Sequence, residues 1–142
     1  MERLNVLIVD DFAIMRDTLK AFLSREGNIN VAGMVENGMK AVELVKKVPV
    51  DVILMDISMP FMNGIKATEV ISESRPHIKI LVLTMHDEIG LLSEALKAGA
   101  CGYLIKPVTK STLMEAIHSV HQGKYYLGFQ TSMSKSLISA NP

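Results

Sequence analysis

Three short runs of consecutive apolar residues constrain the fold of this chain more than any other feature. They read VLIV at 6–9, VILM at 52–55 and ILVL at 80–83, with no polar residue inside any run. A strand of that kind is buried on both faces, which is typical of a parallel sheet covered by helices on each side. With two further apolar segments, the sequence predicts five strands, at 4–9, 29–35, 50–55, 79–84 and 101–105.

Segments with helical spacing separate the predicted strands and follow the last one. Two of them are the stretches 65–73 and 88–97, and the other three carry apolar stripes: Met15, Leu19, Phe22 and Leu23; Ala41, Val42 and Val45; Leu113, Ala116, Ile117 and Val120. A regular alternation of strand and helix requires right-handed crossovers. It predicts a doubly wound α/β fold with a five-stranded parallel sheet.

Size and composition limit the classes of protein to consider. With 142 residues, nearly half of them hydrophobic, the chain suits one domain with a sizeable core. We predict this domain over residues 1–123 and a Ser-rich linker or tail over 124–142. Fifteen Lys and Arg balance fifteen Asp and Glu, so no surface for nucleic acid or anionic membrane is expected. A single cysteine, Cys101, and the lack of a signal peptide or long apolar span predict a cytoplasmic protein.

Polar side chains follow four of the five predicted strands, at the point where each strand ends. Asp10 and Asp11 come after the first strand, Asp56 after the third, Thr84 ends the fourth and Lys106 follows the fifth. In open parallel sheets, ligands bind beyond the carboxyl ends of the strands. If the first and third strands are neighbours, about 4.8 Å apart, their three carboxylates converge.

Three converging carboxylates repel one another unless a cation lies between them. A site with few protein oxygens suits Mg²⁺ better than Ca²⁺, because Mg²⁺ retains several waters. Mg²⁺ and Lys106 together balance the three Asp charges. Such a site can accept a phosphoryl group onto a carboxylate as an acyl phosphate, with the hydroxyl of Thr84 donating to a new oxygen.

Each of these residues also has a purely structural interpretation. Asp11 can cap a helix that begins near Phe12, and Asp56 can belong to a turn with Ser58 and Pro60. Thr84 and Lys106 are common at strand ends and surfaces. All of them together, in this order and at one edge of the sheet, favour a functional site.

The same residues carry a family resemblance. The segments VLIVDD, VILMDISMPFMNG, VLTMHDE and GYLIKP resemble the receiver domain of two-component response regulators over residues 4–122. The resemblance implies strand order 2-1-3-4-5, phosphorylation of Asp56, and phosphoryl oxygens held by Thr84 and Lys106. It implies Mg²⁺, replaceable by Mn²⁺, on Asp11, Asp56 and the backbone carbonyl of Ser58, with Asp10 acting largely through water. A cis bond between Lys106 and Pro107 is implied as well.

Three further positions bear on switching and on rates. Tyr103 stands where the receiver family places its switch aromatic, whose ring fills space that Thr84 vacates when it moves toward the phosphoryl group. The structural alternative for Tyr103 is a half-buried core residue with a solvated hydroxyl. Met85 replaces a residue that is small in many receivers, and a bulky side chain there restricts access to the phosphoryl group. Ser58 and His86 lie where the family tunes autodephosphorylation.

The segment AIHSVHQGKYYLGFQ resembles the receiver end of the NarL/FixJ-type subfamily, in which a linker leads to a DNA-binding domain. No such domain fits after Gly123, so the chain is expected to be either a fragment of a transcription regulator, favoured here, or a free-standing receiver. The implied partners are a sensor histidine kinase and DNA, the latter through the missing domain. A homodimer through the fourth helix, fifth strand and fifth helix is a further possibility.

Two other functions were weighed against a signalling switch. A haloacid-dehalogenase-type phosphatase also uses an Asp nucleophile and Mg²⁺, but it needs an Asp-x-Asp pair after the first strand, and here Asp10 is followed by Asp11 and Phe12. A flavin-binding module of similar topology needs a Ser, Thr and Gly-rich phosphate loop there, and DDFAIM has the opposite charge. The sequence therefore predicts a switch that takes phosphate from a kinase, rather than an enzyme.

Overall fold

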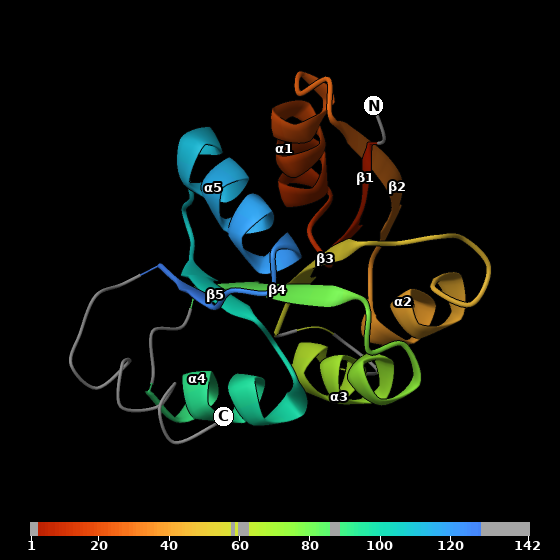
Figure 1. Ribbon diagram of the computed structural model, residues 1–142, viewed down its shortest axis with the longest axis vertical. Coiled ribbons are helices and arrows are strands. Elements are labelled where there is room, and N and C mark those ends of the chain that lie inside the picture. Colours follow the sequence, from red (N-terminus) through yellow and green to blue (C-terminus); the bar gives the residue numbers. More distant parts are fainter. Residues whose placement is uncertain (1–2, 58, 60–62, 86–88, 129–142) are drawn as a thin grey trace.

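The computed structural model describes residues 3–57, 59, 63–85 and 89–128, in which strands and helices alternate along the chain (Figure 1). The strands are β1 (Leu4–Val9), β2 (Ile29–Val35), β3 (Val52–Asp56), β4 (Lys79–Thr84), β5 (Gly102–Ile105) and β6 (Tyr126–Leu127). The helices are α1 (Ala13–Ser24), α2 (Gly38–Leu44), α3 (Gly64–Ser74), α4 (Ile89–Ala98) and α5 (Lys110–His121). The predicted strands lie within two residues of these bounds.

All the strands pair in parallel, in the order β2-β1-β3-β4-β5-β6. The predicted order of the first five strands is confirmed, but the sheet has six strands and not five. The extra strand, β6, falls in the segment that the sequence analysis assigned to a linker or tail. Two residues are too few to produce a recognisable apolar pattern, and their pairing depends on the edge that β5 offers.

Helices cover both faces of the sheet and enclose two separate apolar cores (Figure 1). One core lies beneath α1 and α5 and includes Leu19, Leu23 and Ile117. The other lies beneath α2, α3 and α4 and includes Ile71 and Leu92. Every residue of β3 is buried, as its uninterrupted apolar run predicted. None of the described helices is long and apolar enough to cross a membrane.

Side-chain caps fix where several helices begin. Asn37, Asn63 and Thr109 each accept a hydrogen bond from the backbone N–H three residues ahead, at the starts of α2, α3 and α5. Helix α1 differs, because its N-cap residue is Phe12 and no side chain caps it. The alternative role of Asp11 as a helix cap is therefore wrong, and its carboxylate is available for another function.

Gly64 is packed directly against the backbone that carries Asp56. Its N–H donates to the carbonyl of Ile57 at 2.8 Å, and a Cβ at this position would lie 1.9 Å from the backbone oxygen of Asp56. We expect Gly64→Ala to lower the free energy of unfolding by about 2–3 kcal/mol, because the backbone must move to admit the methyl group. Urea denaturation measures this loss.

Gly90 is the matched control for this substitution. It also lies in the first turn of a helix, but a Cβ there meets nothing within 4 Å. Gly90→Ala should leave the free energy of unfolding unchanged or raise it by up to about 1 kcal/mol, because Ala has the higher helix propensity. Equal losses for the two variants would show that the contact between Gly64 and Asp56 carries no strain.

Candidate functional site

The predicted site residues converge at the carboxyl edge of the sheet. Strands β1 and β3 pair with Val9 opposite Met55, so the residues that follow, Asp10 and Asp56, come side by side. One carboxylate oxygen from each of Asp10, Asp11 and Asp56 lies within 4.8 Å of the others. The fold therefore assembles the three acidic groups that the sequence placed on separate strand ends.

Lys106 brings the balancing positive charge into this cluster. Its Nζ lies 2.7 Å from Oδ2 of Asp10 and 3.7 Å from Oδ1 of Asp56. The side chains of Lys106, Asp10 and Asp56 are only 7%, 2% and 8% exposed. The Lys106 backbone N–H also donates to the carbonyl of Thr84 at 2.7 Å, which fixes the end of β5 against β4. A buried charge needs such pairing, because burial removes its hydration.

Both carboxylate oxygens of Asp10 are engaged in hydrogen bonds. Oδ2 accepts from Lys106, and Oδ1 accepts from the backbone N–H of Phe12 at 2.9 Å. The guanidinium of Arg16 in α1 donates to the backbone carbonyl of Asp10 at 2.7 Å. This bond ties α1 to the residue that follows β1. Arg16 was not predicted from the sequence as part of the site. The sequence feature that could have identified it is an Arg near the start of the helix that follows Asp10 and Asp11.

Asp11 is the acidic residue left without a partner. Its Oδ1 is buried and makes no hydrogen bond to any of the residues that the structure describes. A buried, unpaired carboxylate oxygen is costly unless a ligand or ion satisfies it. Three carboxylates beside one ammonium group also leave a net charge of about −2. The donor set therefore fits a hard divalent cation such as Mg²⁺.

The environment of Asp56 disfavours its ionised form. The pKa of its carboxyl is raised from 3.8 to about 6: burial is the largest cause, the charges of Asp10 and Asp11 also raise it, and the nearby charge of Lys106 acts in the opposite direction. A proton, a cation or a phosphoryl group bound at Asp56 would each relieve this electrostatic cost. The site is therefore arranged to hold a ligand at this carboxylate.

Thr84 and Tyr103 lie on one face of the sheet, on neighbouring strands. Both are completely buried. Val82 is paired with Tyr103, and Thr84 is paired with Ile105, so Thr84 and Tyr103 are diagonal neighbours on the face covered by α2, α3 and α4. The alternative of a half-buried Tyr103 is wrong, because tight packing around the ring excludes solvent.

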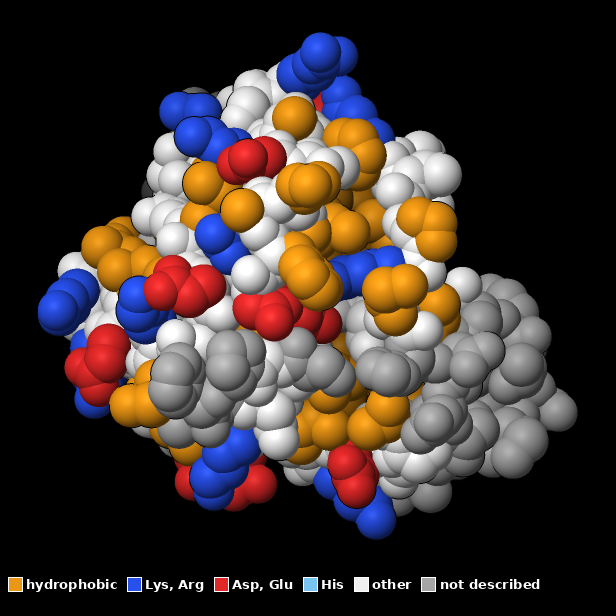
Figure 2. Space-filling model, turned by 180° about the vertical axis from the view of Figure 1, so that it is seen from behind, with side chains coloured by type: hydrophobic (Ala, Val, Ile, Leu, Met, Phe, Trp, Pro, Cys, Tyr) orange, Lys and Arg blue, Asp and Glu red, His pale blue; other side chains and the backbone are white. Residues whose placement is uncertain are grey.

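Exposed apolar side chains border the acidic cluster in the sequence. Phe12 and Ile14 are 65% and 82% exposed just after Asp11, and Met85 is 73% exposed just after Thr84. Figure 2 shows acidic side chains near the middle of one face, with cationic and apolar side chains around them.

The predicted cis bond between Lys106 and Pro107 is confirmed. Ser58 and His86 lie outside the described residues.

The raised pKa of Asp56 gives a pH-dependent prediction for the metal-free protein. Between pH 3.8 and about 6 the folded state holds a proton on Asp56 that the unfolded state has lost. Rising pH across this window therefore lowers the free energy of unfolding, by on the order of 2 kcal/mol. Carboxyl carbon NMR should show Asp56 titrating near pH 6.

Asp56→Asn provides the control for this titration. The variant should lack the transition near pH 6 and lose less stability than the wild type between pH 4 and pH 7. Saturating Mg²⁺ should shift the wild-type midpoint downward, because the cation and the proton compete for the carboxylate. A wild-type midpoint close to 3.8 without metal would contradict this account of the site.

Comparison with known proteins agrees with the geometry. A family model described as the response regulator receiver domain matches residues 6–118. The transcriptional regulatory protein DegU of Brevibacillus brevis is 41% identical over 125 residues, which cover 88% of this chain and 53% of DegU. The chemotaxis protein CheY of Thermotoga maritima is 43% identical, covering 81% of this chain and 95% of CheY. The solved receiver domain of NarL from Mycobacterium tuberculosis superposes with a TM-score of 0.84 at 31% identity, covering 87% of this chain and 100% of that one.

These similarities decide between the functions weighed from the sequence. The chain spans about half the length of DegU, so the similarity concerns one domain of that protein. The matched residues include the whole acidic cluster, Thr84 and Lys106. The similarity to NarL also agrees with the subfamily that the C-terminal segment indicated. Fold, site and sequence together show that the chain belongs to the family of response regulator receiver domains.

Proposed function

We propose that this receiver is a Mg²⁺-dependent switch in which Asp56 accepts a phosphoryl group from a sensor histidine kinase. The observation that carries the proposal is the position of the Asp56 carboxylate, within 4.8 Å of two further carboxylates and 3.7 Å from Lys106. A nucleophilic carboxylate, a place for a divalent cation and an ammonium group meet at one point. Phosphoryl transfer needs these three features.

The proposed transfer joins Asp56 to phosphorus in one displacement. An ionised carboxylate oxygen of Asp56 forms the new bond to phosphorus, and the bond from phosphorus to a histidine nitrogen of the kinase breaks. The electron pair of that bond leaves with the imidazole nitrogen, which takes up a proton from solvent. Lys106 lies close enough to Asp56 to neutralise charge on the phosphoryl oxygens, and the hydroxyl of Thr84 donates to one of them.

Asp11 and Asp56 would hold the cation directly, together with the backbone carbonyl of Ser58. Asp10 is proposed to act through water, because its oxygens are already bonded to Phe12 and Lys106. Mg²⁺ bound there supplies positive charge that draws phosphoryl oxygens to the site. Mn²⁺ can replace it, since carboxylate and carbonyl oxygens suit both ions.

Phosphorylation is proposed to act on Tyr103 through Thr84. The ring of Tyr103 is fully buried in this structure. A phosphoryl group that holds Thr84 toward Asp56 therefore stabilises an arrangement that the domain already adopts, rather than creating a new one. This is a shift of population between two states of the ring.

The output of the switch is proposed to be transcription, in the cytoplasm, through a DNA-binding domain absent from this chain. The similar protein DegU is a transcriptional regulatory protein, and RcsB, matched at 26% identity with a TM-score of 0.81, was solved as dimers bound to DNA. We propose that residues 1–123 form the receiver and that residues 124–142, which include β6, lead to that domain. We keep a homodimer through α4, β5 and α5 as a proposal.

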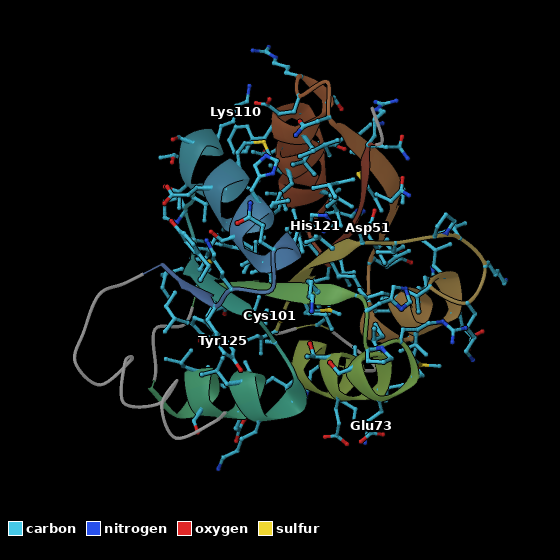
Figure 3. The ribbon with its side chains drawn as sticks, in the orientation of Figure 1. Asp51, Glu73, Cys101, Lys110, His121 and Tyr125 are labelled. Atoms are coloured by element: carbon cyan, nitrogen blue, oxygen red, sulfur yellow. The ribbon has the colours of Figure 1, made fainter. Side chains whose placement is uncertain are left out.

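Phosphorylation at Asp56 can be tested with acetyl phosphate and Mg²⁺. Intact mass should increase by one phosphoryl group in the wild type, and by none in Asp56→Asn or in wild type treated with a chelator of Mg²⁺. Asp51→Asn is the matched control, because Asp51 lies at the opposite end of β3 and its carboxylate accepts from the N–H of Asn5 (Figure 3). Labelling of Asp56→Asn at the wild-type level would refute the proposed acceptor.

The coupling role of Thr84 can be separated from its role in the chemistry. Thr84→Ala should still be phosphorylated, but the NMR signals of the Tyr103 ring should respond to phosphorylation at least about fivefold less. Thr84→Ser keeps the hydroxyl and should restore most of the response. If Tyr103 responds equally in all three proteins, the coupling does not pass through Thr84.

A further inference from the structure

The outer edge of β5 is covered by the chain's own segment. The N–H of Tyr126 donates to the carbonyl of Cys101 at 3.0 Å, and the N–H of Gly128 donates to the carbonyl of Tyr103 at 2.8 Å. Figure 3 shows Cys101 and Tyr125 close together where β5 and β6 begin. The strand that carries Tyr103 is thus bonded through its backbone to the start of the segment that leads out of the domain.

Two glycines let β6 approach β5 this closely. A Cβ on Gly128 would lie 2.6 Å from Cδ2 of Leu104. A Cβ on Gly102 would lie 2.5 Å from Cδ1 of Leu81 and 3.1 Å from the carbonyl oxygen of Tyr126. Gly102 in β5 and Gly128 directly after β6 thus leave room for the two backbones to approach closely, as glycine often does in strands.

The side chains of β6 reach both layers of the domain. Tyr126 packs against the core beneath α1 and α5, and Leu127 packs against the core that contains Tyr103. Leu127 is also the direct partner of Tyr103 in the β5–β6 register. Two such partners on one face of a sheet have side chains in contact range.

Leu127, as the partner of Tyr103 in the register, lies on the sheet-edge side of that residue. On the other side of β5, Val82 and Thr84 of β4 are both completely buried, so no space is open there. An outward turn of the ring toward the edge of the sheet would meet Leu127. With β6 docked, an outward ring and Leu127 compete for the same space.

We infer that β6 is a latch on Tyr103, so that docking of β6 and burial of the ring stabilise each other. This inference rests on the proposed function, in which a phosphoryl group on Asp56 favours the buried ring. Phosphorylation then tightens β6, and by reciprocity a docked β6 strengthens binding at the phosphorylation site. In this inference the signal passes from β5 to residues 126–128 through their backbone hydrogen bonds.

Hydrogen exchange of single backbone amides tests the latch directly. In Mg²⁺, addition of the phosphoryl analogue beryllofluoride should slow exchange at Tyr126 and Gly128 by about tenfold. Leu127 is an internal control, because alternate amides of a strand point to opposite edges and those of Tyr126 and Gly128 on either side of it point to β5. The Asp51 amide, bonded to Asn5 just before β3 begins, should also be unchanged.

The reciprocal effect gives a second test with a matched pair of variants. Leu127→Ala should weaken beryllofluoride binding by about fivefold or more, because β6 no longer blocks the outward ring. Leu44→Ala removes a partly buried leucine from the same core at α2, away from β5, and should leave binding unchanged. Gly128→Val, which lifts β6 by steric contact with Leu104, should reproduce the effect of Leu127→Ala.

The outcomes separate the latch from the function on which it rests. If beryllofluoride shifts the NMR signals of Thr84 but exchange at Tyr126 and Gly128 stays the same, the latch is refuted and the switch stands. Equal weakening by Leu127→Ala and Leu44→Ala would also overturn the latch, since it would reflect general loss of stability. If beryllofluoride leaves Thr84 and Asp56 unaffected, the proposed function fails and the latch with it.

Discussion

The ion pair between Lys106 and the carboxylates of Asp10 and Asp56 is the interaction on which the rest of the site depends. It joins the ends of β1, β3 and β5, which are far apart in the sequence. Without this cation, two buried carboxylates would face each other and the edge of the sheet would spread or take up protons. The shorter contact of this ion pair occupies Asp10, and the proposed metal ion and phosphoryl group are accordingly assigned to Asp11 and Asp56.

This arrangement is electrostatically unfavourable by itself, and the two apolar cores support it. β3 is buried along its whole length, so the acidic edge is anchored by a strand that cannot shift easily. A group of buried charges that is unfavourable by itself can persist when the packed structure around it holds each residue in place. The unfavourable charge then favours ligand binding, because a ligand that neutralises it gains binding energy, and in the proposed switch this energy biases the conformation around Thr84.

The sequence predicted the repeating strands and helices and the residues at the strand ends. It did not predict features that depend on contacts between distant parts of the folded chain. The apolar runs were sufficient to predict the fold class, and the family resemblance added the order of the first five strands. The polar residues after four of the five strands predicted the convergence of Asp10, Asp11, Asp56 and Lys106. Arg16 was missed because its role is a bond to a backbone carbonyl, which leaves no residue pattern. β6 was missed because two residues cannot show periodicity.

Thr84 and Tyr103 both face the core beneath α2, α3 and α4, whereas the core beneath α1 and α5 contains neither of them. In the proposed switch, the sheet therefore separates the core that contains Tyr103 from a second core, which β6 reaches only through Tyr126. Residues of that second core, such as Leu19 and Ile117, are the positions where repacking for a more stable biosensor module is expected to disturb the proposed response least. Natural variation is also expected to be tolerated differently on the two sides.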